Sequence, residues 1–103
     1  MSQWHKVATE DDVNDGEPFV ADVGDIPLAL YRLNGEYFAL GDICPHQGDV
    51  RLSDGYLVDD TIECPLHQSC FAIRSGKVLE PPAEEDVPSY PTRVENGAIY
   101  VEV

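Results

Sequence analysis

Residues 44–67 have the sequence CPHQGDVRLSDGYLVDDTIECPLH, which carries one Cys and one His near each end. One residue separates Cys44 from His46, two separate Cys64 from His67, and 17 residues lie between the two pairs. Two thiols and two imidazoles on two short loops can bind zinc or an iron–sulfur cluster. Structural zinc sites usually pair like ligands, so these mixed pairs favour a two-metal centre in which the thiols bind one iron and the imidazoles the other.

The segments around this stretch have strand patterns. Asn34-Gly35 and Asn96-Gly97 each join two apolar runs, and Asn-Gly favours the tight turn of a β-hairpin. These two hairpins are expected at 26–43 and 90–103, with shorter strands at 19–23, 56–58, 61–64, 70–73 and 77–79 and one helical turn at 9–13. The sequence therefore predicts an all-β fold.

Composition limits the classes of function. A chain of 103 residues with 43% hydrophobic content predicts one domain over 1–103. The formal net charge of -14 disfavours nucleic acid and anionic lipid and favours a partner with a basic surface. No segment has the length and hydropathy of a membrane span or the pattern of a signal peptide, so we expect a cytoplasmic protein without a membrane partner.

The ligand pattern C-x-H-x17-C-x2-H, with Pro45 and Pro65 after the cysteines, resembles that of the Rieske [2Fe-2S] family. The resemblance implies the Rieske fold, an antiparallel β-sheet sandwich with a small cluster-binding subdomain inserted. Its cluster-binding loops would occupy approximately 42–72 and a proline loop approximately 80–88. It also implies one Rieske-type [2Fe-2S] cluster per chain, whose inner iron is bound by Cys44 and Cys64 and whose outer iron is bound by His46 and His67.

Within this family, the chain is most similar to the ferredoxin components of bacterial aromatic ring-hydroxylating dioxygenases. Gly55-Tyr56-Leu57, Phe71, Ser75-Gly76-Lys77 and the late YPTRVENG carry that likeness. It implies a one-electron carrier, not itself an enzyme, between an NAD(P)H-dependent flavin reductase and a terminal oxygenase, and we expect a monomer. The alternatives are the ferredoxin of a di-iron aromatic monooxygenase, the small subunit of an assimilatory nitrite reductase, and a zinc module without redox function.

The resemblance also gives roles to residues around the ligands. Ser69 occupies the site of a Ser that bonds a bridging sulfide in high-potential members, and Phe71 occupies that of their Tyr. The same members have a disulfide at the positions of Asp49 and Leu66, so its absence here implies a lower potential. Pro82 is expected to cover the cluster, and a contact rim is expected from Gln47, Gly48 and Gln68.

Other residues are interpreted from their type and position. We predict Cys70 to be a small buried residue that is not a ligand, Trp4 to lie in the core and His5 on the surface. Acidic residues near the cluster end are candidates for steering a basic partner, namely Asp42, Asp49 and Glu84-Glu85-Asp86.

Overall fold

The computed structural model describes residues 3–45, 50–65, 69–80 and 85–103, and these form strands and two short 3-10 helices but no α-helix. The strands are β1 Trp4–Thr9, β2 Phe19–Val20, β3 Leu28–Leu33, β4 Glu36–Gly41, β5 Tyr56–Val58, β6 Thr61–Glu63, β7 Cys70–Ala72, β8 Val78–Glu80, β9 Ser89–Tyr90, β10 Thr92–Glu95 and β11 Ala98–Glu102. The 3-10 helices are Glu10–Asp12 and Leu52–Asp54. The predicted all-β class is confirmed.

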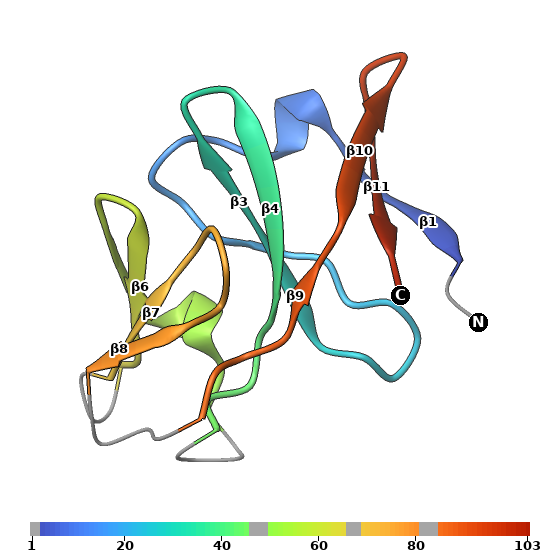
Figure 1. Cartoon of the computed structure of the whole chain (residues 1–103). Coiled ribbons are helices and arrows are strands. Elements are labelled where there is room, and N and C mark those ends of the chain that lie inside the picture. Colours follow the sequence, from blue (N-terminus) through green and yellow to red (C-terminus); the bar gives the residue numbers. More distant parts are fainter. Residues whose placement is uncertain (1–2, 46–49, 66–68, 81–84) are drawn as a thin grey trace.

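Three antiparallel sheets make up the described fold, with strand orders β1-β11-β10, β2-β3-β4-β9 and β5-β6-β7-β8. Figure 1 shows the β3–β4 hairpin between the β10–β11 hairpin and the sheet that contains β6, β7 and β8. The third sheet is inserted in the chain between β4 and β9, which pair with each other. The sequence predicted a small inserted subdomain. The inserted sheet forms it, and its last strand, β8, ends at Glu80.

Both predicted Asn-Gly hairpins are present. Asn34 and Gly35 have φ values of 53° and 83° between β3 and β4, and Asn96 and Gly97 have 52° and 79° between β10 and β11. Positive φ at both central residues gives a turn whose twist matches that of the paired strands. The helical turn predicted at 9–13 is also found, as the 3-10 helix Glu10–Asp12. The Thr9 backbone N–H donates to Asp12 Oδ2 over 3.0 Å and so caps the start of this turn.

Two apolar clusters lie on opposite faces of the central strand β3. Leu28 and Leu30 belong to the cluster that includes Ile99 and Val101 of β11. The alternate residues of β3 belong to a second cluster with the third sheet, here named the cysteine-end core, whose buried members are Ala29, Tyr31, Leu33, Leu40, Cys44, Leu52, Ile62, Cys64, Phe71, Ile73 and Val87. Because both faces are covered, β3 is almost continuously apolar instead of alternating.

The prediction that Trp4 lies in the core is wrong. Trp4 is only partly buried, in neither apolar cluster, and the Arg93 guanidinium carbon lies 4.5 Å from the centre of its ring. His5, predicted on the surface, is also partly buried. A large aromatic residue near the start of an edge strand can cover sheet surface and stack with a cation without entering the core.

The Tyr31 hydroxyl gives a stability prediction. Tyr31 is fully buried, burial raises the pKa of its phenol, and its oxygen has no hydrogen-bond partner among the described residues. Tyr31→Phe removes a polar group whose burial is not compensated there, so the free energy of unfolding should stay the same or rise by about 1 kcal/mol. Urea unfolding measures this change, and a loss of more than about 1 kcal/mol would show that the hydroxyl has a partner outside the described residues.

Candidate metal centre

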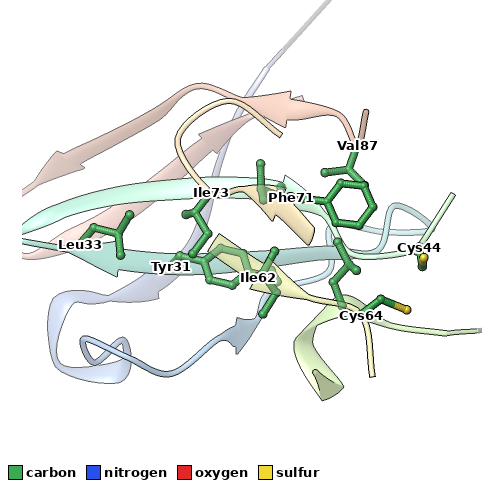
Figure 2. Close-up of a cluster of buried hydrophobic side chains, with 11 residues drawn as sticks. Tyr31, Leu33, Cys44, Ile62, Cys64, Phe71, Ile73 and Val87 are labelled. Carbon is green, nitrogen blue, oxygen red and sulfur yellow. The ribbon is translucent and has the colours of Figure 1, made fainter. Parts of the chain in front are cut away.

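Two of the four predicted ligands, Cys44 and Cys64, lie at one end of the cysteine-end core. Cys44 follows β4 by three residues, Cys64 directly follows β6, and both side chains are fully buried. Figure 2 shows their sulfur atoms at the end of the core opposite Leu33. Two elements of different sheets therefore bring two thiols to one solvent-excluded end of the same core.

Each cysteine lies at the base of a short loop, where a backbone hydrogen bond joins the two ends of the loop. The Cys44 backbone N–H donates to the Val50 carbonyl over 2.9 Å, and Ile43 pairs with Arg51. The Cys64 N–H donates to the Ser69 carbonyl over 2.8 Å, beside the Glu63–Cys70 pair of β6 and β7. Both chain segments that contain a predicted His ligand are thus closed at their bases by backbone hydrogen bonds.

The other predicted site residues of these two loops, and two of the predicted proline loop, lie outside the described residues. They are His46, Gln47, Gly48, Asp49, Leu66, His67, Gln68, Pro82 and Glu84. Within the part of the chain that the structure describes, no group of three or more His, Cys, Asp or Glu side chains could hold a metal ion. Cys44 and Cys64 alone supply half of a four-ligand set, so a complete centre needs donors from the remaining residues.

Ser69 and Phe71 border this end of the core. Both are fully buried, and Phe71 packs in the cysteine-end core with Cys64. The Ser69 side chain therefore does not face solvent. The apolar surroundings of the two thiols fit a centre that is kept from water, since the hydrophobic shell of a metal site controls solvent access.

Cys70 differs from the other two cysteines. It is partly exposed, not fully buried as predicted, and lies in β7. Burial, together with the carboxylates of Glu80 and Glu63, raises the pKa of its thiol. A thiol whose pKa is raised is less often ionised at neutral pH, so Cys70 is a weaker nucleophile than an ordinary exposed cysteine.

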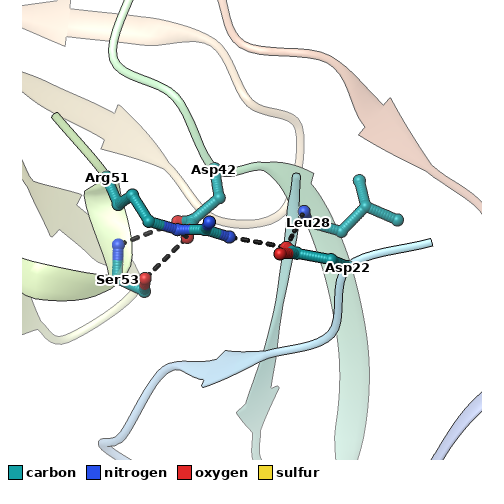
Figure 3. Close-up of polar contacts among 5 residues, drawn as sticks. All are labelled: Asp22, Leu28, Asp42, Arg51 and Ser53. Atoms are coloured by element: carbon teal, nitrogen blue, oxygen red, sulfur yellow. Dashed lines mark hydrogen bonds and ion pairs between the residues drawn. The ribbon is translucent and has the colours of Figure 1, made fainter. Parts of the chain in front are cut away.

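An ion-pair network centred on one buried carboxylate, that of Asp42, holds the base of the first loop (Figure 3). Asp42, two residues before Cys44, is fully buried, and its carboxylate accepts hydrogen bonds from the Ser53 backbone N–H over 2.8 Å and the Ser53 hydroxyl over 2.6 Å. It also accepts one from Arg51 Nε over 2.8 Å. Asp42 therefore connects the chain entering the loop to the chain leaving it.

Arg51 extends this network to the second sheet. Its Nη2 donates to Asp22, which also accepts the Leu28 backbone N–H over 3.0 Å. The hydrogen bond from Arg51 lowers the pKa of Asp22, and the two carboxylates raise that of Arg51. The stabilisation from the Asp22 shift is present above the unfolded pKa of the carboxyl and is lost as the pH falls through its folded pKa.

Asp42, one of the candidates for steering a partner, does not have that role, because its charge is buried and compensated by Arg51. Asp86 also has a structural bond, since it accepts the Val78 N–H over 2.8 Å, although it stays exposed. The sequence analysis missed the network, although Asp42 follows an apolar strand and Arg51 is one of only 6 basic residues. These two features suggest a pair, but the burial of Asp42 that gives the pair its weight is visible only in the structure.

Comparisons with known proteins agree on one family. The family model of the Rieske [2Fe-2S] domain matches residues 3–91. The anthranilate 1,2-dioxygenase ferredoxin subunit of Burkholderia cepacia is 39% identical over 103 residues, which are 100% of this chain and 94% of that protein. No described helix is long and apolar enough to cross a membrane.

Two solved structures show the likeness in three dimensions. The Sphingomonas yanoikuyae B1 ferredoxin superposes with a TM-score of 0.92 at 29% identity, covering 98% of this chain and 99% of that one. A chain from the complex of reduced oxygenase and oxidized ferredoxin in carbazole 1,9a-dioxygenase gives a TM-score of 0.87 at 34% identity, covering 95% of this chain and 91% of that one.

Proposed function

The chain belongs to the Rieske [2Fe-2S] family, and from this membership we propose that it carries electrons to the terminal oxygenase of an aromatic ring-hydroxylating dioxygenase system. Its cofactor is one Rieske-type cluster, and the chain is an electron-transfer component instead of an enzyme. We propose an NAD(P)H-dependent flavin reductase as the donor. Two similarities support an oxygenase as the acceptor: one to the ferredoxin subunit of anthranilate 1,2-dioxygenase, and one to a chain of the oxygenase–ferredoxin complex in carbazole 1,9a-dioxygenase.

One observation carries the chemistry: two fully buried thiols lie at one end of one core, each at the base of a closed loop. We propose that Cys44 and Cys64 bind the inner iron and that His46 and His67 bind the outer one. An extended chain spans at most about 3.6 Å per residue, so His46 is within about 7 Å of Cys44 along the chain. The same limit on chain length applies to His67, which is two residues before the buried Ser69 in the sequence.

Such a centre accepts and donates one electron, and neutral imidazoles in place of two thiolates raise its potential from about -400 mV to the range of about -150 to +300 mV. The residues around the ligands set the position within this range. Phe71 is fully buried and has no hydroxyl to donate to a ligand sulfur. Together with the absence of a cysteine at position 49 or 66, this favours the low end of the range.

Ser69 acts in the opposite direction. Its side chain is fully buried beside the base of the second loop, and we propose that its hydroxyl donates to a sulfide of the cluster. Ser69→Gly and Ser69→Ala should both lower the midpoint potential, because a hydrogen bond to sulfur favours the reduced, more negative state. Spectroelectrochemical titration measures the midpoints, with Ser75→Ala at an exposed site as the control. Unchanged midpoints in both Ser69 variants would contradict this role.

Several finer parts of the proposal concern residues outside the described ones. We propose that Pro82 covers the cluster and that Gln47, Gly48 and Gln68 contribute to the contact rim. We also propose one domain over 1–103, a monomer in solution and a cytoplasmic location. Among the acidic residues proposed for steering, Glu85 is exposed, while Asp49 and Glu84 are not described.

Reconstitution tests the proposed function. A flavin-dependent ferredoxin reductase, NADH, this protein and the oxygenase of the anthranilate 1,2-dioxygenase system are combined with anthranilate, and product formation is measured with and without this protein. We expect turnover only with all components and a decrease as salt screens the protein pairs. A di-iron aromatic monooxygenase and an assimilatory nitrite reductase, assayed in parallel, test the two alternative systems. Turnover with either one, but with no ring-hydroxylating oxygenase, would contradict the proposal.

A further inference from the structure

The third sheet buries only one of its two faces. Leu57, Ile62, Phe71 and Val78 form one cross-strand row and contact or belong to the cysteine-end core. Because side chains alternate along a strand, their neighbours point to the opposite face. On that side Tyr56 is 62% exposed and Val58 is 57% exposed, and both belong to β5, the edge strand of the sheet.

A second cross-strand row crosses this open face at the cluster end. Tyr56 pairs with Glu63, Glu63 with Cys70, and Cys70 with Glu80. Glu63 immediately precedes Cys64, and Cys70 immediately follows the buried Ser69. The row Tyr56–Glu63–Cys70–Glu80, here named the outer rim, therefore runs along the base of the second predicted ligand loop.

The charge of the outer rim is not balanced. Glu63 and Glu80 are the cross-strand partners of Cys70 on either side, so all three side chains lie on the same face of the sheet. Burial, and then these two carboxylates, raise the pKa of the Cys70 thiol. Among the described residues, the ion pairs involve Arg51, Arg74 and Arg93, and neither Glu63 nor Glu80 belongs to one. An exposed aromatic side chain beside two carboxylates that no described cation neutralises is the composition of a surface that binds a basic protein.

We propose that the outer rim is a docking surface for the electron acceptor of this carrier, a redox protein with a Lys- or Arg-rich surface and an apolar recess for Tyr56. The inference rests on the proposed carrier function and adds where the acceptor binds. Glu63 and Glu80 attract the basic surface before contact. Tyr56 then supplies apolar contact at close range, which holds the acceptor beside the ligand loop.

The test measures electron transfer to mitochondrial cytochrome c, a basic haem protein, by stopped flow at low salt. The cluster-loaded double variant Glu63→Gln/Glu80→Gln should reduce cytochrome c about 3- to 10-fold more slowly than the wild type, and the difference should shrink as salt rises. The matched control is Asp11→Asn/Glu102→Gln, which removes the same charge from the first 3-10 helix and from β11, at two carboxylates that belong to none of the ion pairs among the described residues. Its rate should stay close to that of the wild type.

Tyr56→Ala separates the apolar contribution from the charge. Its rate should fall about 3-fold or more at every salt concentration, because apolar contact is not screened. Val94→Ala is its control, since Val94 is 40% exposed on β10. Midpoint potentials and absorption spectra of all variants correct for any change at the cluster. The rate of Cys70 alkylation, measured as a function of pH, gives the pKa of its thiol. This pKa should be lower than in the wild type only in Glu63→Gln/Glu80→Gln.

The outcomes separate the two proposals. Failure of the reduced wild type to reduce cytochrome c would overturn the carrier function itself. Wild-type reduction with equal rates in the rim and control variants would overturn the docking surface alone. Unchanged reduction of cytochrome c by the rim variants, together with slower electron uptake from the flavin reductase, would likewise overturn the assignment to the acceptor.

Discussion

Cys64→Ser protein is expected to bind no cluster and to lose all electron-transfer activity, and Cys44→Ser protein is expected to do the same. Both thiols are fully buried at one end of one core, and a serine hydroxyl ionises far less readily than a thiol. The reason for the loss is therefore ligand chemistry rather than volume. Iron, sulfide and the visible spectrum of the purified variants measure it, with far-UV circular dichroism as the test of folding.

The chain supplies matched controls for this prediction. It has 3 Cys and 3 His, and the proposed centre uses two of each. Cys70→Ser and His5→Asn should keep the full iron content, whereas His46→Asn and His67→Asn should lose the cluster or retain it only in part. Full iron in Cys64→Ser protein would contradict the ligand set, and so would iron loss in folded Cys70→Ser protein.

Asp42→Asn should lower the free energy of unfolding by about 2–4 kcal/mol, because a hydrogen-bonded charge pair is broken in a buried position. The substitution keeps the volume but replaces the acceptor of Arg51 Nε and of the Ser53 hydroxyl. Since these bonds join the two chain segments at the base of the first loop, the variant should also lose its cluster faster. Urea unfolding and the decay of visible absorption during incubation measure the two effects.

Asp22→Asn is the control for Asp42→Asn. It removes the same charge from the same Arg51, but the Asp22 side chain is 41% exposed whereas that of Asp42 is 0% exposed. Exposed ion pairs contribute less than about 1 kcal/mol, so Asp22→Asn should be nearly neutral. Equal losses in the two variants would show that burial of Asp42 is not the source of its effect.

The local features of the fold could be predicted from the sequence because they depend on neighbouring residues. Asn34-Gly35 and Asn96-Gly97 specify turns through their own dihedral preferences, and the strands on either side follow from them. The ligand pattern is also local, since each Cys-His pair spans four residues or fewer. The two hairpins were predicted correctly, and the ligand set remains a proposal.

Long-range pairing explains what the sequence analysis missed. Asp42 has the same residue type as the exposed carboxylates, and only its approach to Arg51 and Ser53 shows that it is buried. The outer rim depends on the pairing of four strands and on the irregularity between Cys70 and Phe71, which shifts the register against β8. No spacing along the chain indicates that Tyr56 and Glu80 share one row.

The central claim is that two Cys and two His hold a [2Fe-2S] cluster, and the most direct test is the electron paramagnetic resonance spectrum of the dithionite-reduced protein with iron and sulfide counted on the same sample. We expect two iron and two sulfide per chain, a visible chromophore that bleaches on reduction, and the low average g value of mixed Cys and His ligation. A colourless protein with bound zinc that does not take up iron and sulfide on reconstitution would contradict the claim. So would a reduced spectrum with the higher average g value of all-Cys ligation.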